Sequence, residues 1–232
     1  MPFSRLAAPI AASLAALLAA CSGESSTPAS ENSGASAASS AAAGDMDIKD
    51  TDIVIGADDA PVTIIEYASI TCGGCANFHA TTFPELKEKY IDTGKVRFVF
   101  REFPVVPSGL ADLSFAGSML ARCLGAQKGV DAYFAAIKGL MKTMHPLKDF
   151  EYIETPRQWL LDAAAEAGMD EAAFEACVQD TELFDQLKAQ VEHGAETYDI
   201  SGTPSFIING QPRRMFTIEQ FDEALAPLLS SE

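Results

Sequence analysis

Positive charge is scarce in this chain. Its 232 residues include 16 Lys and Arg against 33 Asp and Glu, which gives a formal net charge of -17. Nucleic-acid binding depends on Lys and Arg that neutralise phosphates, and attraction to anionic lipid surfaces needs the same cations. The shortage of cations therefore argues against a nucleic-acid-binding protein and against membrane adhesion by charge alone.

Long hydrophobic runs are also missing from the start of the chain. The apolar stretch 6–18 is short for a transmembrane helix; it follows Arg5 and leads into Leu-Ala-Ala-Cys, ending at Cys21. These flanks are typical of an export signal, and small residues before a cysteine resemble the lipobox of bacterial lipoproteins. We expect residues 1–21 to form a lipoprotein signal peptide and Cys21 to be lipidated. An ordinary secretory signal cleaved nearby is the alternative.

Apolar periodicity is absent from the next stretch, residues 22–47, which consists largely of Ser, Ala and Gly. Such a segment cannot bury enough surface to offset its conformational entropy, so we expect a disordered tether. The remainder, 48–232, has the length of one domain or of a domain with a large insertion. With 48% hydrophobic residues and 14 Phe in the chain, it can form a substantial core.

Histidine and cysteine are few, which limits the metal sites that the chain can build. One Cys-x-x-Cys is present, Cys72 to Cys75, and His79 extends it to a superficial Cys-x2-Cys-x3-His pattern. A structural zinc site needs further ligands, and no second Cys-x-x-Cys or paired His follows. We therefore favour a redox pair over a metal site, with metal binding as the alternative, and expect His79 on the surface of a helix.

The position of Cys72 and Cys75 gives them a chemical role. They follow an apolar stretch, 62–67, that predicts a buried strand, and they open a helical pattern. Unpaired backbone N–H groups and the positive end of the dipole stabilise a thiolate at a helix N-terminus. Cys75 lies one turn later, within reach of a disulfide. Cys72 is thus the candidate nucleophile and Cys75 the resolving thiol.

Glu66 interrupts the apolar strand six residues before Cys72. A carboxylate on a strand covered on both faces would be poorly solvated, which favours its protonated form. It could then accept and return the proton that Cys75 loses and regains during exchange. The alternative is that Glu66 lies at the frayed end of the strand and faces water.

The other cysteines form an even set once Cys21 is set aside. Four cysteines allow three connectivities, and the short spacing makes Cys72–Cys75 the obvious local pair. Cys123 and Cys177 then pair by elimination, with a role in stability, because exported proteins tend to oxidise adjacent thiols. Two separate buried thiols are the alternative.

Strands and helices alternate along the rest of the chain. Strands are expected at 52–56, 62–67, 96–101 and 206–208, and Arg213 to Phe216 is expected to return from an Asn209-Gly210 hairpin turn. Helical spacing dominates 108–198, with a possible helix end at Gly125. Thr217 to Gln220 predicts a capping box for a last helix. The order predicts an α/β fold with helices inserted mid-domain.

This pattern resembles the DsbA-type thiol:disulfide oxidoreductases of bacterial envelopes. The likeness rests on a strand ending in Cys-x-x-Cys, a Gly-Thr-Pro at 202–204 before the hairpin, and the closing helix, and it covers about residues 52–229. It implies a thioredoxin fold in two parts, 48–107 and 199–232, around an α-helical insertion, 108–198. It also implies that Thr203 and Pro204 form a cis-proline loop for substrate beside the sulfurs, and that Glu66 is the family's buried acid.

The resemblance implies disulfide exchange in the periplasm or cell envelope. Expected partners are unfolded or reduced exported proteins, a quinone-linked membrane redox partner, and a membrane held through the N-terminal lipid. No cofactor is expected, and the lack of a dimerising N-terminal domain favours a monomer. Gly73-Gly74 replaces the Pro-His of the enteric oxidase, which predicts a less oxidising couple. The alternatives are a reductase or isomerase on the same fold, and a non-catalytic envelope lipoprotein that binds metal or unfolded chains.

Overall fold

The computed structural model describes residues 48–104, 111–144 and 156–230, all within one compact unit. The predicted signal peptide, Cys21 and the tether therefore lie outside the described residues. The elements run β1 (Ile53–Ile55), β2 (Val62–Ala68), α1 (Gly73–Thr81), α2 (Phe83–Leu86), η2 (Lys87–Ile91), β3 (Val96–Glu102), α3 (Ala111–Lys128), α4 (Val130–Met144), α5 (Pro156–Glu166), α6 (Glu171–Val178), α7 (Thr181–Tyr198), β4 (Ser205–Ile208), β5 (Gln211–Arg213) and α8 (Ile218–Leu229).

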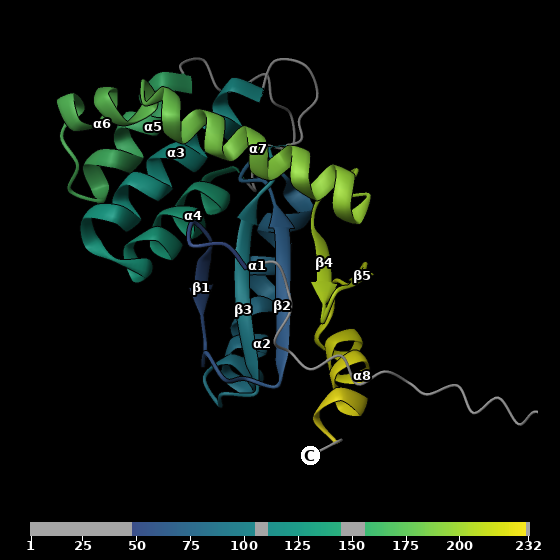
Figure 1. Cartoon of the computed structure of the whole chain (residues 1–232). Coiled ribbons are helices and arrows are strands. Elements are labelled where there is room, and N and C mark those ends of the chain that lie inside the picture. Colours follow the sequence, from purple (N-terminus) through teal and green to yellow (C-terminus); the bar gives the residue numbers. More distant parts are fainter. Residues whose placement is uncertain (1–47, 105–110, 145–155, 231–232) are drawn as a thin grey trace, which may run out of the picture. The chain divides into compact units, whose positions relative to one another are not determined.

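The strands form one five-stranded sheet in the order β1-β3-β2-β4-β5 (Figure 1). β2 lies at its centre, parallel to β3 and antiparallel to β4, while β1 and β5 are the two edges. β3 and β4 flank β2 although, in the described part of the chain, the five helices α3 to α7 lie between them in sequence. The α/β thioredoxin arrangement with an inserted helical block is therefore the observed fold.

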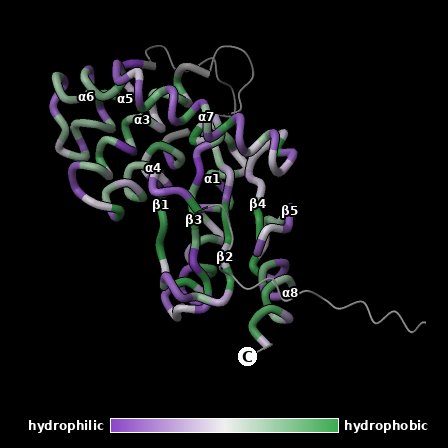
Figure 2. The backbone as a smooth tube through the Cα atoms, viewed as in Figure 1, coloured by the Kyte–Doolittle hydropathy of each residue, from purple (hydrophilic) through white to green (hydrophobic). Residues whose placement is uncertain are grey.

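Every residue of β2 is buried, so the prediction of a strand covered on both faces is confirmed. Alternate residues enter two cores: Ile64 and Ala68 join the larger core with α1, α4 and α8, whereas Ile65 and Tyr67 join a smaller core with Val191 of α7. In Figure 2 green predominates along β1 and β4, whereas the helices alternate between green and purple. The strand leading to Cys72 is thus held from both sides.

β5, the return strand of the hairpin that follows β4, begins earlier than the sequence predicts. Asn209 and Gly210 both have positive φ, 43° and 80°, as a two-residue type I′ turn requires. Because this turn is so short, Gln211 pairs directly with Ile208 and β5 ends at Arg213. The expected return strand up to Phe216 is wrong, since Phe216 N–H donates to the Gln220 side chain at 2.7 Å, in the cap of α8.

The expected helix end at Gly125 is also wrong, because α3 continues to Lys128. A Cβ at Gly125 would lie 3.0 Å from the Cβ of Tyr133 on α4. The glycine therefore permits a close approach of two helices, which outweighs its cost inside α3. α3 packs against α4, α5, α6 and α7 and forms the centre of the helical block.

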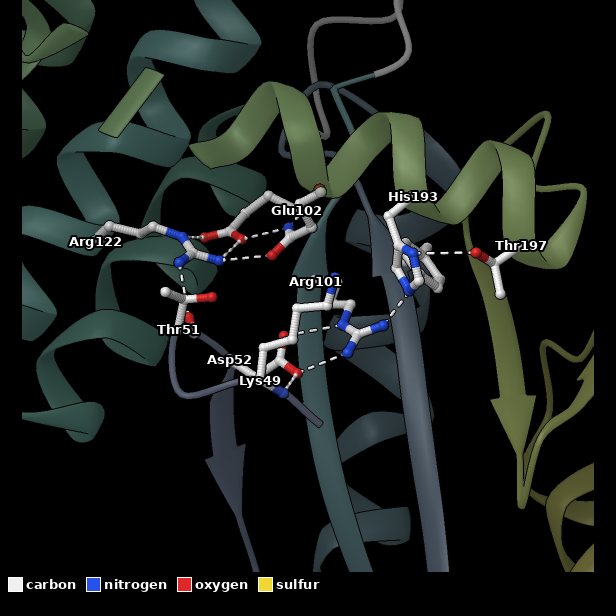
Figure 3. Close-up of polar contacts among 10 residues, drawn as sticks. Lys49, Thr51, Asp52, Arg101, Glu102, Arg122, His193 and Thr197 are labelled. Atoms are coloured by element: carbon white, nitrogen blue, oxygen red, sulfur yellow. Dashed lines mark hydrogen bonds and ion pairs between the residues drawn. The ribbon is translucent and has the colours of Figure 1, made fainter. Parts of the chain in front are cut away.

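Charged side chains join this block to the end of β3, as Figure 3 shows. Buried Arg101 donates to both carboxylate oxygens of Asp52, at 2.9 and 2.7 Å, and to the Tyr67 hydroxyl at 2.9 Å. Glu102 accepts from Arg122 of α3, and Gln190 of α7 donates to the Glu102 carbonyl at 2.8 Å. Burial would raise the pKa of Glu102, but the charge and hydrogen bonds of Arg122 lower it overall.

Among the described residues, no helix combines the length and apolar character needed to cross a membrane.

Candidate active site

Cys72 is the N-cap of α1, directly after the buried strand β2 and the short link that follows it. Its backbone is extended and its sulfur accepts the N–H of Cys75 at 3.3 Å, as a capping side chain does. The side chain is partly exposed, whereas Cys75, one turn later, is buried. The structure therefore places an accessible sulfur beside an inaccessible one, and the two are not joined in a disulfide.

The surroundings lower the pKa of Cys72 to about 6, from an ordinary value of 9.0. The largest cause is a hydrogen bond from the Cys75 side chain. Bonds from the Thr203 side chain and from the backbone of Cys75 and Gly74 add to it, and together they outweigh the opposing effect of burial. At neutral pH the thiolate form of Cys72 therefore predominates, which is the reactive form of a cysteine.

The pKa of Cys75 moves the other way, well above its ordinary value. Burial is the main cause, and the hydrogen bond to Cys72 and the charges of Cys72 and Glu66 raise it further. One sulfur is thus disposed to attack or leave as a thiolate, and the other holds its proton.

The loop before β4 covers the accessible sulfur. The Thr203–Pro204 peptide bond is cis, and the Cys72 thiol donates a hydrogen bond to the Thr203 carbonyl oxygen at 3.3 Å. A Cβ at Gly74 would lie 3.2 Å from Cδ of Pro204 and 3.7 Å from the sulfur of Cys72, whereas one at Gly73 would meet nothing within 4 Å. The structure thus places Thr203 and Pro204 against the Cys-x-x-Cys.

Glu66 is fully buried, so the alternative of a frayed, water-facing residue is wrong. Its side chain is 2.9 Å from Nε2 of His79, which is only 6% exposed. The expectation that His79 lies on the surface is therefore wrong as well. His79 follows Cys75 by four residues and so shares its buried face of α1. That spacing was the available sign, but its partner on β2 could not be read from local sequence.

Three buried hydroxyls were not singled out from the sequence. Ser69 lies 3.0 Å from Thr71 and 2.8 Å from Ser114 of α3, measured between hydroxyl oxygens. The Ser69 carbonyl accepts the N–H of Cys72 at 3.1 Å. These contacts fix the segment before Cys72 against the helical block. Serine and threonine are too common in loops for sequence alone to mark them.

Cys123 of α3 and Cys177 of α6 are joined in a disulfide with an S–S distance of 2.03 Å. Cys177 packs with Met119 and Leu187 in a small core of the helical block. Cys123 and Cys177 thus link two helices away from the Cys-x-x-Cys. Within the described ranges, no group of three or more His, Cys, Asp or Glu side chains is placed to hold a metal ion.

Comparison with known proteins agrees with this fold. A family model described as thioredoxin matches residues 49–226. The crystal structure of Wolbachia pipientis alpha-DsbA1 superposes with a TM-score of 0.69 at 26% identity, over 79% of this chain and 93% of that one. Oxidised BdbD from Bacillus subtilis has a TM-score of 0.61 at 21% identity, over 78% and 94% of the two chains, and supports the fold.

The chain belongs to the thioredoxin family. A relative from Rickettsia bellii, named "Putative protein-disulfide oxidoreductase", is 30% identical over 178 residues, which make up 77% of this chain. The match spans 64% of the length of that relative, so a substantial part of the relative has no counterpart in the alignment.

Proposed function

We propose that this protein is a thiol:disulfide oxidoreductase that introduces disulfides into exported proteins. The observation that carries the proposal is the pairing of Cys72, whose pKa is lowered to about 6, with buried Cys75, whose pKa is raised. A low-pKa thiolate is a good leaving group and is stable in the reduced enzyme, and both properties favour donation of a disulfide.

The proposed reaction begins with the oxidised Cys72–Cys75 pair. A substrate thiolate attacks the sulfur of Cys72; the bond between Cys72 and Cys75 breaks, and Cys75 leaves and takes up a proton. A second substrate thiolate then attacks the substrate sulfur of the mixed disulfide, and Cys72 leaves as a thiolate. The substrate loses two electrons in forming its disulfide, and the enzyme gains them as a dithiol.

The cis-proline loop is the proposed platform for the substrate. The Thr203 carbonyl oxygen lies 3.3 Å from the sulfur of Cys72 and accepts a hydrogen bond from its thiol. An extended substrate segment could use the backbone of Thr203 in the same way, which would hold its cysteine beside Cys72. Pro204 has no N–H of its own and packs close to Gly74, so it closes one side of the approach.

The reduction potential tests the direction of exchange. We expect the purified protein, equilibrated against glutathione, to have a potential near or above that of the glutathione pool. A value near that of thioredoxin, about -270 mV, would contradict the oxidase and favour the reductase on the same fold. Reductive refolding of a scrambled substrate would favour an isomerase. Exchange that persists at the wild-type rate in Cys72→Ser would contradict the mechanism. A wild-type protein that shows no exchange would favour the non-catalytic envelope lipoprotein.

Location and partners belong to the same proposal. The Leu-Ala-Ala-Cys ending at Cys21 supports export and lipidation, with residues 22–47 as a tether to a membrane surface. Reoxidation would then come from a quinone-linked membrane protein, and the enzyme would act as a monomer. Mass spectrometry of the mature N-terminus tests the lipid: a chain beginning at an acylated Cys21 is expected, and an unmodified N-terminus elsewhere would contradict it.

A further inference from the structure

The oxidised-to-reduced cycle described above requires a proton for Cys75, and the structure contains a buried pair suited to supply it. Cys75 and His79 share the inner face of α1, and β2 presents Glu66 on the side that also carries Ile64 and Ala68. Nε2 of His79 lies 2.9 Å from Oε2 of Glu66, with 6% and 0% of the two side chains exposed. Both side chains are therefore buried in the core.

The position of the His79 ring is fixed by aromatic neighbours. Ring centroids of Phe83, Phe78 and Phe100 lie 4.7, 5.4 and 5.6 Å from the imidazole centroid. With the ring confined, its hydrogen bond holds one oxygen of Glu66. The other oxygen, Oε1, is buried and has no hydrogen-bond partner among the described residues. An unpaired buried carboxyl oxygen is costly and calls for a role, and Oε1 is the oxygen left open to accept a proton.

The charge of Glu66 raises the pKa of two further titratable groups. Cys75 is one, and the Tyr133 phenol on α4, which donates to Glu102 at 2.7 Å, is the other. A thiolate at Cys75 beside an ionised Glu66 would place two negative charges in a low-dielectric core. Moving the proton from Cys75 to Glu66 leaves only one negative charge there, which is the electrostatic reason to couple the two groups.

The structure assigns His79 as a positioning residue for proton exchange at Cys75, acting through Glu66. This inference rests on the proposed exchange reaction. When Cys75 leaves the enzyme disulfide, the Glu66–His79 pair gives it a proton, directly or through one water. In the reverse step Cys75 returns that proton to the pair and attacks Cys72 in a mixed disulfide; the bond from Cys72 to the substrate breaks, and the departing thiolate takes a proton from solvent.

A single-turnover reaction of the reduced full-length protein with glutathione disulfide separates the two steps. Cys72 first forms a mixed disulfide with glutathione, and Cys75 then displaces the glutathione. Rapid acid quench and mass spectrometry at a series of pH values follow both species. The variants are His79→Phe, His79→Gln, Glu66→Gln and the double variant Glu66→Gln/His79→Phe, with His193→Gln on α7 as a control for loss of a histidine elsewhere.

We expect His79→Phe to slow the second step at neutral pH by about tenfold and to move its pH midpoint upward. The first step should stay within about twofold, because Cys72 attacks without this pair. His79→Gln keeps an N–H donor for Glu66 and should lie nearer the wild type. The double variant should be no slower than Glu66→Gln, since His79 acts through Glu66, and His193→Gln should leave both steps unchanged.

The assignment would be overturned if the double variant slowed the second step by the product of the two single-variant effects, because that marks independent action. An unchanged second step in His79→Phe would overturn it as well. Equal slowing of both steps would overturn it too, because that marks a general structural defect. If His79→Phe does not fold, His79→Leu, which also removes the N–H donor, replaces it in the same cycle with Glu66→Gln. A wild-type protein that never displaces glutathione would instead refute the exchange function itself.

Discussion

Cys72 and Cys75 lie one helical turn apart, and their pKa values are shifted in opposite directions through the same contact. The Cys75 side chain donates a hydrogen bond to Cys72; this bond is the largest cause of the lowered pKa of Cys72 and, after burial, the largest cause of the raised pKa of Cys75. Each sulfur therefore shifts the pKa of the other. Cys75 makes Cys72 more acidic, and Cys72 makes Cys75 less acidic.

The alkylation rate of reduced Cys72 should follow a titration with a midpoint near pH 6, the value to which its pKa is lowered. Iodoacetamide reacts with the thiolate, so its rate against pH reports that pKa. In Cys75→Ala the midpoint should rise, because the largest stabilising hydrogen bond is gone. A midpoint that does not change in Cys75→Ala would contradict the mutual arrangement.

The same shift predicts how the stability of the reduced protein depends on pH. The folded pKa of Cys72 is about 6 against 9.0 for an ordinary thiol, so between these values the unfolded chain binds more protons. The free energy of unfolding should therefore rise with pH through this window, relative to Cys72→Ser, and the gain should vanish below about pH 6. Urea titrations of both proteins at pH 5.5 and pH 8 check the sign.

Gly74→His should make the couple more oxidising. A side chain there starts 3.7 Å from the sulfur of Cys72, so an imidazole can donate to the thiolate. Each unit by which the pKa of Cys72 falls should raise the reduction potential by about 30 mV. Gly73→His is the matched control, because its Cβ meets nothing within 4 Å, and Gly74→Ala tests the close contact with Pro204. Equal potentials in both histidine variants would contradict the prediction.

Removing the disulfide with Cys123→Ala/Cys177→Ala should lower the stability of the protein without abolishing exchange. The two cysteines are 54 residues apart, and closing a loop of that size stabilises a fold by up to about 4 kcal/mol. Guanidinium unfolding of the double variant measures the loss, and the reduction potential of the remaining pair serves as the control. A lost exchange activity in a folded double variant would contradict a purely stabilising role.

Gly194→Ala should destabilise the packing of α7 on the sheet by about 1–3 kcal/mol. The new Cβ would lie 2.6 Å from Cε1 of Tyr67, whose hydroxyl is bonded to Arg101 and whose ring cannot move freely. Gly139→Ala in α4 is the control; its Cβ meets nothing within 4 Å, so a gain of about 0.5–1 kcal/mol is expected. Thermal unfolding of both variants decides whether contact or helix propensity dominates.

Local patterns were sufficient for the redox pair and for most elements. The apolar run of β2 and the N-terminal position of Cys72 follow from nearest neighbours in sequence, and so does the capping box of α8, where Thr217 N–H donates to Gln220 at 3.2 Å. Roles set by distant partners did not follow. The buried position of His79 depends on its contact with Glu66, which lies on β2. α3 continues beyond Gly125 because Tyr133 of α4 packs closely against that glycine.

The helical block leaves and rejoins the sheet on the two sides of β2. Glu102, at the end of β3, pairs with Ala68, and Ser205, at the start of β4, pairs with Tyr67. Two strand spacings separate these points, about 10 Å. Any replacement of the block during evolution has only to span that gap. Lineages can therefore diversify the surface beside the cysteines while the strand that carries them is inherited unchanged.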